Sequence, residues 1–305
     1  MEKCIIGLDI GGTNLRIGAV TGDMEVPFRQ VTKSEEISGA NDPLKALGDK
    51  IAAFMRETNL APLAVSIGVP SSVRKDNATV VCTTNLKNGD GKAIFQNANI
   101  VSYLQKVLKI PVYVNNDTSN ILLCDIYHNH LENDPVTAGI YIGTGVGASV
   151  VIDGHVFKGA DGVALDLGHI PYYKSYDRCS CGKCGCCECY ASGWRLEQIR
   201  EEHYPKDRIR DLFLLHGEEE PLTDFLYACS HVFSVMATIF NPSTIVAGGG
   251  VLEMQGFPRE RFEKMVAENT GYDVMSCGFR YVYSRPYPEK GIIGAALYAQ
   301  KLMNQ

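Results

Sequence analysis

A short cysteine-rich segment constrains this chain more than any other part of its sequence. Residues 162–192 hold six of the chain's eleven cysteines, and a histidine precedes them. A histidine followed by the spacing C-x-C-x4-C can offer a zinc ion one nitrogen and three sulfur ligands in a tetrahedron. Gly182 and Gly185 would let the backbone turn tightly between those ligands. The sequence therefore predicts a structural zinc site whose ligands are His169, Cys179, Cys181 and Cys186.

Two other interpretations of this segment compete with zinc. Disulfides would require an oxidising compartment, and the N-terminal residues lack the apolar core and cleavage site of a secretory signal. A nucleic-acid-binding ribbon would need more basic residues than Arg178 and Lys183, the two within residues 178–189. The choice of thiolates stays open, because three further cysteines give alternative ligand sets: Cys184, Cys187 and Cys189.

The overall composition is that of an ordinary soluble globular protein. The chain has 305 residues, of which 45% are hydrophobic and 21% charged, enough for two packed lobes or one large domain. Its net charge of −6 argues against a nucleic-acid-binding surface, which needs clustered lysine and arginine. No apolar run is expected to approach the roughly 20 residues of a membrane span. These features predict a cytoplasmic protein.

The order of predicted elements indicates an α/β protein. In the first part of the chain, strands are expected at residues 3–8, 15–20, 26–31, 63–69 and 111–114, and helices at residues 43–58, 93–108 and 118–131. Asp42 is the expected N-cap of the helix that starts at Pro43. In the second part, strands are expected at residues 136–142, 148–152, 243–247 and 280–283, and helices at residues 193–202, 221–240, 257–269 and 291–302.

The first strand runs into a turn that could bind phosphate. Gly11, Gly12 and Thr13 separate the first two predicted strands, and the exposed amides of such a turn can cradle a phosphate group. A plain hairpin is the alternative interpretation. Asp9 favours the phosphate site, because a carboxylate at the strand end can hold magnesium directly or through water.

A second carboxylate lies at a strand-to-helix corner. Asn115, Asn116 and Asp117 follow a predicted strand and precede a helix. Such a carboxylate is well placed to act as a catalytic base, but it is equally an ordinary helix N-cap. The spacing alone does not decide between these two roles.

The second half of the chain repeats the first in outline. Residues 143–147 again form a turn rich in glycine and threonine between two strands. Two such turns facing each other across a cleft could hold a polyphosphate from both sides. Gly248, Gly249 and Gly250 follow a later strand and permit the close approach of a flat ligand such as an adenine–ribose unit. Trp194, the only tryptophan, is expected to be a packing anchor.

With these motifs the chain resembles the ROK family of sugar kinases over essentially its whole length. Residues 9–13 and 143–147 look like the family's two phosphate motifs, and Asn116–Asp117 looks like its catalytic pair. Residues 162–188 are similar to its long and specific E-x-G-H…C-x-C-G-x-x-G-C-x-E signature. Within the family, the bacterial D-allose kinases look most similar, through residues 210–213, 248–251 and 257–260.

This resemblance implies a fold and a reaction. The fold is the actin-like, hexokinase-like (ribonuclease H-like) ATPase fold, an α/β fold with two lobes around a cleft. The expected lobes are residues 1–116 plus 291–305, and residues 117–290, which carry the zinc loop. The implied reaction transfers the γ-phosphoryl group of ATP, with Mg²⁺, to the 6-hydroxyl of a hexose, with D-allose as the best match and structural Zn²⁺ beside the site. Glucose, N-acetylmannosamine and fructose are alternative acceptors, and a homodimer is expected.

The resemblance also implies a role for each matching residue. Asp117 would be the general base that removes the proton of the sugar hydroxyl, and His169 would bind both sugar and zinc. The implied sugar-binding residues are Asn85, Asn116, Asp117, Asp166, His169 and Glu188. The implied contacts to ATP and its magnesium are Asp9, Gly11, Gly12, Thr13, Gly143, Thr144, Gly145, Gly248, Gly249 and Gly291.

The sequence departs from the family pattern at two positions, and two functions other than a sugar kinase are considered. Asp166 replaces the usual glutamate, and Ser71 replaces the glycine that usually follows Pro70, so one sugar contact and the loop over the sugar are open. A sugar-responsive transcriptional regulator would need an added N-terminal DNA-binding module, and the phosphate motif already begins at Asp9. The presence of Asp9, Asn116 and Asp117 together disfavours a sugar-binding module without catalysis.

Overall fold

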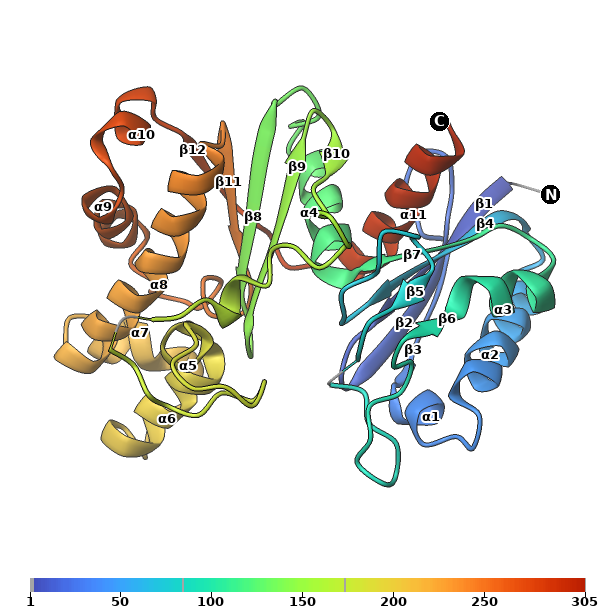
Figure 1. Cartoon of the computed structure of the whole chain (residues 1–305), viewed down its shortest axis with the longest axis horizontal. Coiled ribbons are helices and arrows are strands. Elements are labelled where there is room, and N and C mark those ends of the chain that lie inside the picture. Colours follow the sequence, from blue (N-terminus) through green and yellow to red (C-terminus); the bar gives the residue numbers. More distant parts are fainter. Residues whose placement is uncertain (1–2, 84, 173, 305) are drawn as a thin grey trace. The chain divides into compact units, whose positions relative to one another are not determined.

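The computed structural model describes residues 3–83, 85–172 and 174–304, which form two compact units (Figure 1). Unit 1 consists of residues 1–128, 158–164 and 287–305, and unit 2 of residues 129–157 and 165–286. Each unit has its own sheet and its own hydrophobic core. The chain therefore passes between the units several times.

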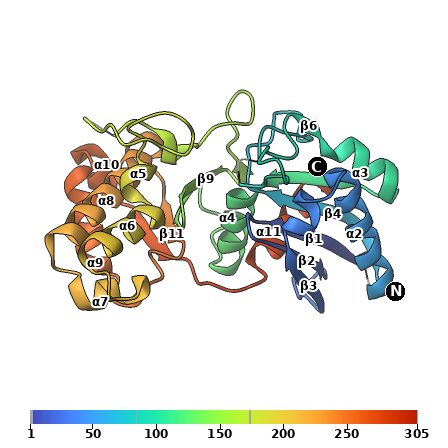
Figure 2. The same cartoon turned by 90° about the horizontal axis from the view of Figure 1, so that it is seen from below.

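Unit 1 is a sheet with helices on both faces. Its strands are β1 (Lys3–Ile10), β2 (Asn14–Val20), β3 (Phe28–Lys33), β4 (Ala61–Val69), β5 (Thr79–Val80), β6 (Ala98–Asn99) and β7 (Val112–Asn116). Its helices are α1 (Glu35–Ser38), α2 (Pro43–Thr58), α3 (Ile100–Leu108), α4 (Asp117–His128) and α11 (Lys290–Met303). The main sheet has the order β3-β2-β1-β4-β7, antiparallel from β3 to β1 and parallel from β1 to β7. Helices α2 and α3 cover one face, and α4 and α11 cover the other (Figure 2).

Unit 2 repeats this topology. Its strands are β8 (Val136–Ile142), β9 (Val146–Ile152), β10 (His155–Val156), β11 (Thr244–Gly248) and β12 (Arg280–Tyr283). Its helices are α5 (Glu188–Ala191), α6 (Gly193–His203), α7 (Leu212–His216), α8 (Glu220–Phe240), α9 (Arg259–Asn269) and α10 (Tyr272–Cys277), with 3₁₀ turns η1 (Leu167–His169) and η2 (Ile209–Asp211). The sheet order is β10-β9-β8-β11-β12, again an antiparallel hairpin followed by parallel strands. The predicted internal repeat is confirmed.

The boundary between the units differs from the prediction, because α4 belongs to unit 1 and not to the second lobe. A Cβ atom on Gly294 of α11 would overlap the carbonyl oxygen of Asn120 on α4, so the glycine lets the two helices lie in direct contact. Lys290 Nζ and Asp125 Oδ1 then form a buried ion pair at 3.0 Å between these helices. Burial of this pair and of the glycine contact fixes α4 to α11.

Most predicted elements are present, and capping explains one that is shorter. Helix α2 begins at Pro43 with Asp42 as N-cap, whose side chain accepts a hydrogen bond from Lys45 N. The helix expected at residues 93–108 begins only at Ile100, because the Asn99 side chain caps it by accepting from Ser102 N. Residues 93–99 instead hold strand β6 and two residues with positive φ.

Helix α8 corrects the expectation about apolar runs. It has 21 residues and is long and apolar enough, by length and composition, to cross a membrane. Of its most apolar 18-residue window, 61% is buried inside unit 2. Phe225 and Phe233 of α8 are fully buried in the unit 2 core, which is the ordinary position of such a helix in a soluble domain.

Candidate active site

The predicted site residues fall in both units and are described unit by unit. The residues in unit 1 are Asp9, Gly11, Gly12, Thr13, Asn85, Asn116, Asp117 and Gly291. The residues in unit 2 are Gly143, Thr144, Gly145, Asp166, His169, Cys179, Cys181, Cys186, Glu188, Gly248 and Gly249. Some lie at the hairpin turns or at the carboxyl ends of parallel strands, where α/β proteins bind ligands, and the others lie in loops or at the start of a helix.

Asp9 lies near the end of β1 and forms an ion pair with Arg16. It is opposite Arg16 in the antiparallel ladder, and Arg16 Nη1 lies 3.2 Å from Asp9 Oδ2. Burial raises the pKa of Asp9, and the Arg16 charge offsets part of this effect. A Cβ atom on Gly291 would lie 2.5 Å from Asp9 Cγ. Gly291, expected near adenosine, therefore lies directly against the predicted magnesium ligand.

Ser34, which follows β3, makes two hydrogen bonds to the first hairpin turn. Its hydroxyl donates to the Gly11 carbonyl at 2.6 Å, and its amide donates to the Thr13 carbonyl at 3.0 Å. These bonds use carbonyl groups on one side of the turn, and Gly12 and Thr13 remain exposed. The geometry suits a turn that presents its amides to an anion.

Asn116, and not Asp117, caps helix α4. Asn116 Oδ1 accepts from Ser119 N at 3.1 Å, and its Nδ2 donates to the Ser71 carbonyl at 3.3 Å. The Asp117 carboxylate accepts from Thr118 N at 2.7 Å through Oδ1. Because Asn116 supplies the cap, the ordinary structural role of a carboxylate at this corner is already filled.

Asp117 has the titration behaviour of a general base. Burial raises its pKa, the negative charge of Asp9 raises it further, and the result is about 7. The Thr118 hydrogen bonds lower it only in part. A carboxylate with this pKa can accept a proton near neutral pH and hold it through a reaction step.

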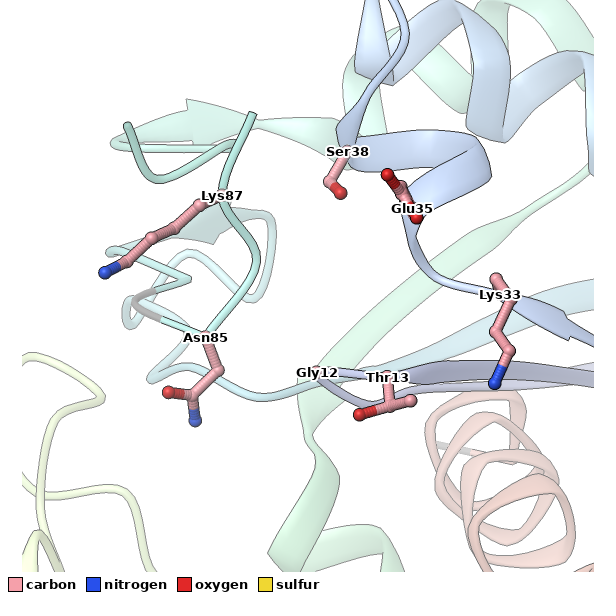
Figure 3. Close-up of a pocket in the computed structure, with 7 residues that line it drawn as sticks. All are labelled: Gly12, Thr13, Lys33, Glu35, Ser38, Asn85 and Lys87. Carbon is pink, nitrogen blue, oxygen red and sulfur yellow. The ribbon is translucent and has the colours of Figure 1, made fainter. Parts of the chain in front are cut away.

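A polar cavity of about 720 Å³ adjoins the first hairpin turn in unit 1 (Figure 3). Its lining residues are Gly12, Thr13, Lys33, Glu35, Ser38, Asn85 and Lys87. Lys33 and Lys87 lie on opposite sides of the hollow, with Asn85 and Thr13 between them. The cavity therefore joins a predicted phosphate contact, Thr13, to a predicted sugar contact, Asn85.

Glu188 connects the cysteine-rich segment to the second hairpin. Its Oε2 atom accepts from Val146 N at 3.0 Å. A Cβ atom on Gly145 would overlap this carboxylate, and one on Gly168 would lie 3.2 Å from it. Two glycines therefore make room for one glutamate, which holds the second turn in place.

The four predicted metal ligands come together in unit 2. Their ligand atoms, on His169, Cys179, Cys181 and Cys186, all lie within 4.8 Å of one another. Cys181 Sγ is 3.6 Å from Cys186 Sγ, and Cys179 Sγ is 3.6 Å from His169 Nδ1. A tetrahedral site with Zn–S bonds of about 2.3 Å needs sulfur atoms roughly 3.8 Å apart, so this donor set fits zinc.

Cys184 and Cys187 have other surroundings, whereas Cys189 packs in one buried cluster with Cys179 and Cys186. Cys184 is exposed, Cys187 is buried in the apolar core of unit 2, and Cys189 Sγ donates to the Asp177 carbonyl at 3.7 Å. Gly182 and Gly185 have φ angles of +90° and +78°, which confirms the predicted tight turns. Burial raises the pKa of Cys179, but hydrogen bonds from Cys181 and Cys186 outweigh it and bring the pKa down to about 7.

His169 presents its two ring nitrogens to different neighbours. Nδ1 faces Cys179, and Nε2 lies 3.9 Å from Asp166 Oδ1. One ring can therefore contribute Nδ1 to a metal and leave Nε2 for a second partner. Asp166 is largely exposed, with 72% of its side chain accessible.

Sequence reasoning missed several residues of this site. Arg16 was not assigned a role, although its register opposite Asp9 could have been read from a hairpin alignment. The cavity residues Lys33, Glu35, Ser38 and Lys87 come from a strand end, a short helix and a loop, and they form no motif. Trp194 is 46% exposed, so the expectation of a packing anchor is wrong.

Comparisons with known proteins identify the family of this chain. The model of the ROK family matches residues 5–302. A glucokinase from Thermotoga maritima is 26% identical over 268 residues, covering 81% of this chain and 82% of that protein. A xylose repressor from Caldicellulosiruptor bescii is 30% identical over 222 residues, covering 72% of this chain and 54% of that protein.

A solved structure extends the likeness to the fold. A ROK family glucokinase from Streptomyces griseus, in complex with glucose and AMPPNP, superimposes with a TM-score of 0.76 at 21% identity. The alignment covers 98% of this chain and 99% of that one. This likeness supports the hexokinase-like, actin-like ATPase fold. By the family match and the curated relatives, the chain belongs to the ROK family and is a carbohydrate kinase.

Proposed function

We propose that this kinase transfers the γ-phosphoryl group of ATP to the 6-hydroxyl of a hexose, with D-allose as the leading candidate. The observation that carries the proposal is Asp117, a carboxylate with a pKa of about 7 whose capping role is taken by its neighbour. Its carboxylate accepts local hydrogen bonds from Thr118 and is not the N-cap of α4. Removal of a proton from an alcohol is the chemistry that it suits.

Asp117 would act by accepting the proton of the acceptor hydroxyl as its oxygen attacks phosphorus. Phosphoryl transfer passes through a loose transition state, so alignment and charge neutralisation supply most of the catalysis. Thr13 and the glycine amides of the two hairpins would hold the phosphate oxygens. Asp9 would hold Mg²⁺, directly or through water, and the ion would neutralise charge on the phosphates.

The acceptor sugar would be bound by polar side chains from both units. Asn85 and Asn116 in unit 1, and His169, Asp166 and Glu188 in unit 2, are the proposed partners of its hydroxyl groups. Asn116 Nδ2 donates to the backbone carbonyl of Ser71, so Ser71 positions this side chain through its backbone and not through its hydroxyl. Each such hydrogen bond discriminates between epimers because a misplaced hydroxyl leaves a polar group unpaired.

Zinc would have a structural role in this scheme. His169 Nδ1, Cys179, Cys181 and Cys186 account for four ligands, which leaves no open position for a reactant. The metal would fix the loop between η1 and α5 and thereby orient His169 and Glu188. Its contribution to catalysis would be the position of these two side chains.

A panel of hexoses assayed with Mg-ATP in a coupled assay tests the proposal. We expect phosphorylation with the highest kcat/KM on D-allose, compared with glucose, N-acetylmannosamine and fructose. A higher kcat/KM on another of these sugars would overturn the allose assignment and keep the kinase. Absence of ATP-dependent phosphorylation of every hexose, with sugar-dependent binding to DNA in a gel-shift assay, would favour a regulator.

Assembly and location complete the proposal. We expect a cytoplasmic homodimer, as the family resemblance implies. Light scattering after size-exclusion chromatography would give the mass directly, for comparison with the 33.4 kDa of one chain. A mass equal to that of one chain at micromolar concentration would contradict the dimer.

A further inference from the structure

The only tryptophan lies exposed beside the second hairpin. Trp194 is the second residue of α6, and 46% of it is accessible to solvent. Its amide donates to the Thr144 carbonyl at 3.1 Å, which fixes its backbone against the turn that the sequence predicts to bind phosphate. An indole can stack on a flat ring, so an exposed tryptophan whose backbone is bonded to this turn can contact the aromatic part of a bound molecule.

The backbone of α6 is not available for a ligand. Gly193 N donates to the Gly143 carbonyl at 2.7 Å, Trp194 N to the Thr144 carbonyl, and Arg195 N to the Ser192 hydroxyl at 3.3 Å. The first three amides of the helix are therefore bonded within unit 2. What α6 can offer to a bound molecule at this end is a side chain, and the exposed one is Trp194.

The start of α6 also lies next to the predicted adenosine turn. A Cβ atom on Gly193 would lie 2.5 Å from the Gly143 carbonyl and 3.4 Å from a methyl group of Val251. Val251 N donates to the Ile142 carbonyl at 3.0 Å, so the turn after β11 is bonded to the end of β8. The hairpin, the glycine turn and the first turn of α6 are thus joined in one patch of unit 2.

The glycines of this patch leave space for a flat ring. Gly143 and Gly250 have no atom within 4 Å of the position that a Cβ would occupy. Gly249, with φ of +94°, is instead packed against the backbone of Ile142. The patch therefore combines open space at two glycines with an exposed tryptophan whose backbone is bonded to the same turn, and an indole face can stack on an aromatic ring.

We propose that Trp194 is the stacking surface for the purine base of the nucleotide. This inference rests on the proposed function and adds a base-binding residue to it. The hairpin amides would take the phosphates, and the indole face would take the base. Stacking of a base on an aromatic side chain contributes roughly 1–3 kcal/mol by alanine substitution, so loss of the indole should weaken nucleotide binding about tenfold.

The single tryptophan makes the proposal directly measurable in the unmodified protein. Tryptophan emission is recorded during titration with Mg-ADP and, separately, with Mg-tripolyphosphate, which carries phosphates without a base. Calorimetry in parallel reports whether each compound binds. We expect Mg-ADP to change the emission and tripolyphosphate to leave it unchanged at concentrations where calorimetry shows both to be bound.

Variants separate stacking from general packing. Trp194→Ala should raise KM for ATP about tenfold, with kcat and KM for the sugar within about twofold of the parent enzyme. Trp194→Phe keeps an aromatic face and should recover most of this loss, whereas Trp194→Leu should not. Tyr272→Ala is the control, since Tyr272 is an 85% exposed aromatic residue on α10 of the same unit.

These measurements distinguish failure of the stacking role of Trp194 from failure of the kinase proposal. Mg-ADP that binds by calorimetry without changing the emission, or an identical emission change with tripolyphosphate, would overturn the stacking role and leave the kinase proposal intact. An unchanged KM for ATP in folded Trp194→Ala would do the same. Failure of Mg-ADP to bind the parent protein would overturn both proposals.

Discussion

The two hairpins share a topology and differ in how their turns are supported. In unit 1, Ile10 pairs with Leu15 and the turn contains residues 11–14, whereas in unit 2 Ile142 pairs with Val146 and the turn contains residues 143–145. The pair preceding the first turn is Asp9 with Arg16, and the pair preceding the second is Tyr141 with Gly147. The first hairpin therefore has a charged pair in its own strands next to the turn, and the second hairpin has no charged residue at the corresponding pair.

The second hairpin receives its charged group from elsewhere in the chain. Glu188, from the cysteine-rich segment, accepts from Val146 N, and the first amides of α6 bond to the carbonyls of Gly143 and Thr144. The first hairpin is held by the short-range contacts of Ser34. Under the proposed function, unit 1 would supply the reactive carboxylates, whereas the turn of unit 2 is held by contacts from residues 188–194 that follow the proposed zinc ligands.

The largest expected effect concerns the carboxylates of unit 1. Asp117→Asn should lower kcat about 10²–10⁴-fold, the usual range for a general base, while zinc content stays unchanged and thermal stability does not fall. Steady-state kinetics, metal analysis and a melting curve measure these quantities. Asp49→Asn, at an exposed carboxylate on α2, is the matched control and should keep full activity. Near-parent activity in Asp117→Asn would remove the residue from the proposed role.

Loss of the metal tests whether the proposed zinc site orients the sugar-binding side chains of unit 2. Cys181→Ala should release zinc and raise KM for the sugar about 10–100-fold, because the loop that orients His169 and Glu188 loses its anchor. Cys184→Ala is the matched control, since Cys184 is an exposed cysteine of the same loop outside the ligand group. Equal zinc content in the two variants would show that Cys181 is not a zinc ligand. Unchanged sugar binding in a zinc-free protein would show that the metal does not orient His169 and Glu188.

The pH dependence should report the raised pKa of Asp117. At saturating Mg-ATP, kcat/KM for the sugar should rise with pH through an apparent pKa at or below about 7, since Mg²⁺ near Asp9 would lower the value of about 7 found without it. The group binds its proton more tightly in the folded state, so its contribution to stability falls as pH rises from 3.8 to about 7. A flat kcat/KM profile across this interval would contradict the assignment.

The smallest expected effect distinguishes the charge of Glu188 from its hydrogen bond. Glu188→Ala leaves Val146 N without its acceptor and should lower the free energy of unfolding by about 1–3 kcal/mol. Glu188→Gln keeps an acceptor oxygen and should lose less than half of that, although both variants should bind the sugar less tightly. Chemical denaturation measures the difference, and equal losses would show that the charge and not the hydrogen bond holds the turn.

Local chemistry made several elements predictable. Asp42 and Pro43 predict the start of α2 because a capping side chain and a proline each satisfy the first turn of a helix. The spacing from His169 to Cys186 predicts the ligand group because a tetrahedral metal site tolerates few arrangements. In both cases the deciding contacts lie close together in the sequence.

Other features depend on contacts between distant segments. Helix α4 joins unit 1 through Gly294 and Lys290, more than 160 residues away in the chain, and no local pattern of residues 117–128 indicates this. Residues 158–164 also belong to unit 1, where Lys158 Nζ donates to Asn77 Oδ1 at 2.6 Å and to Tyr298 OH at 2.8 Å. The cavity beside Thr13 likewise forms from three segments with no shared motif.

The sequence by itself determined the repeated strand–turn–strand units and the spacing of the proposed metal ligands, because each depends on residues that are near neighbours in the chain. Only the tertiary structure decided that Asn116, and not Asp117, caps α4, that Arg16 faces Asp9, and that Trp194 is exposed. These facts depend on burial and on distances between side chains, which arise only when the strands and helices pack.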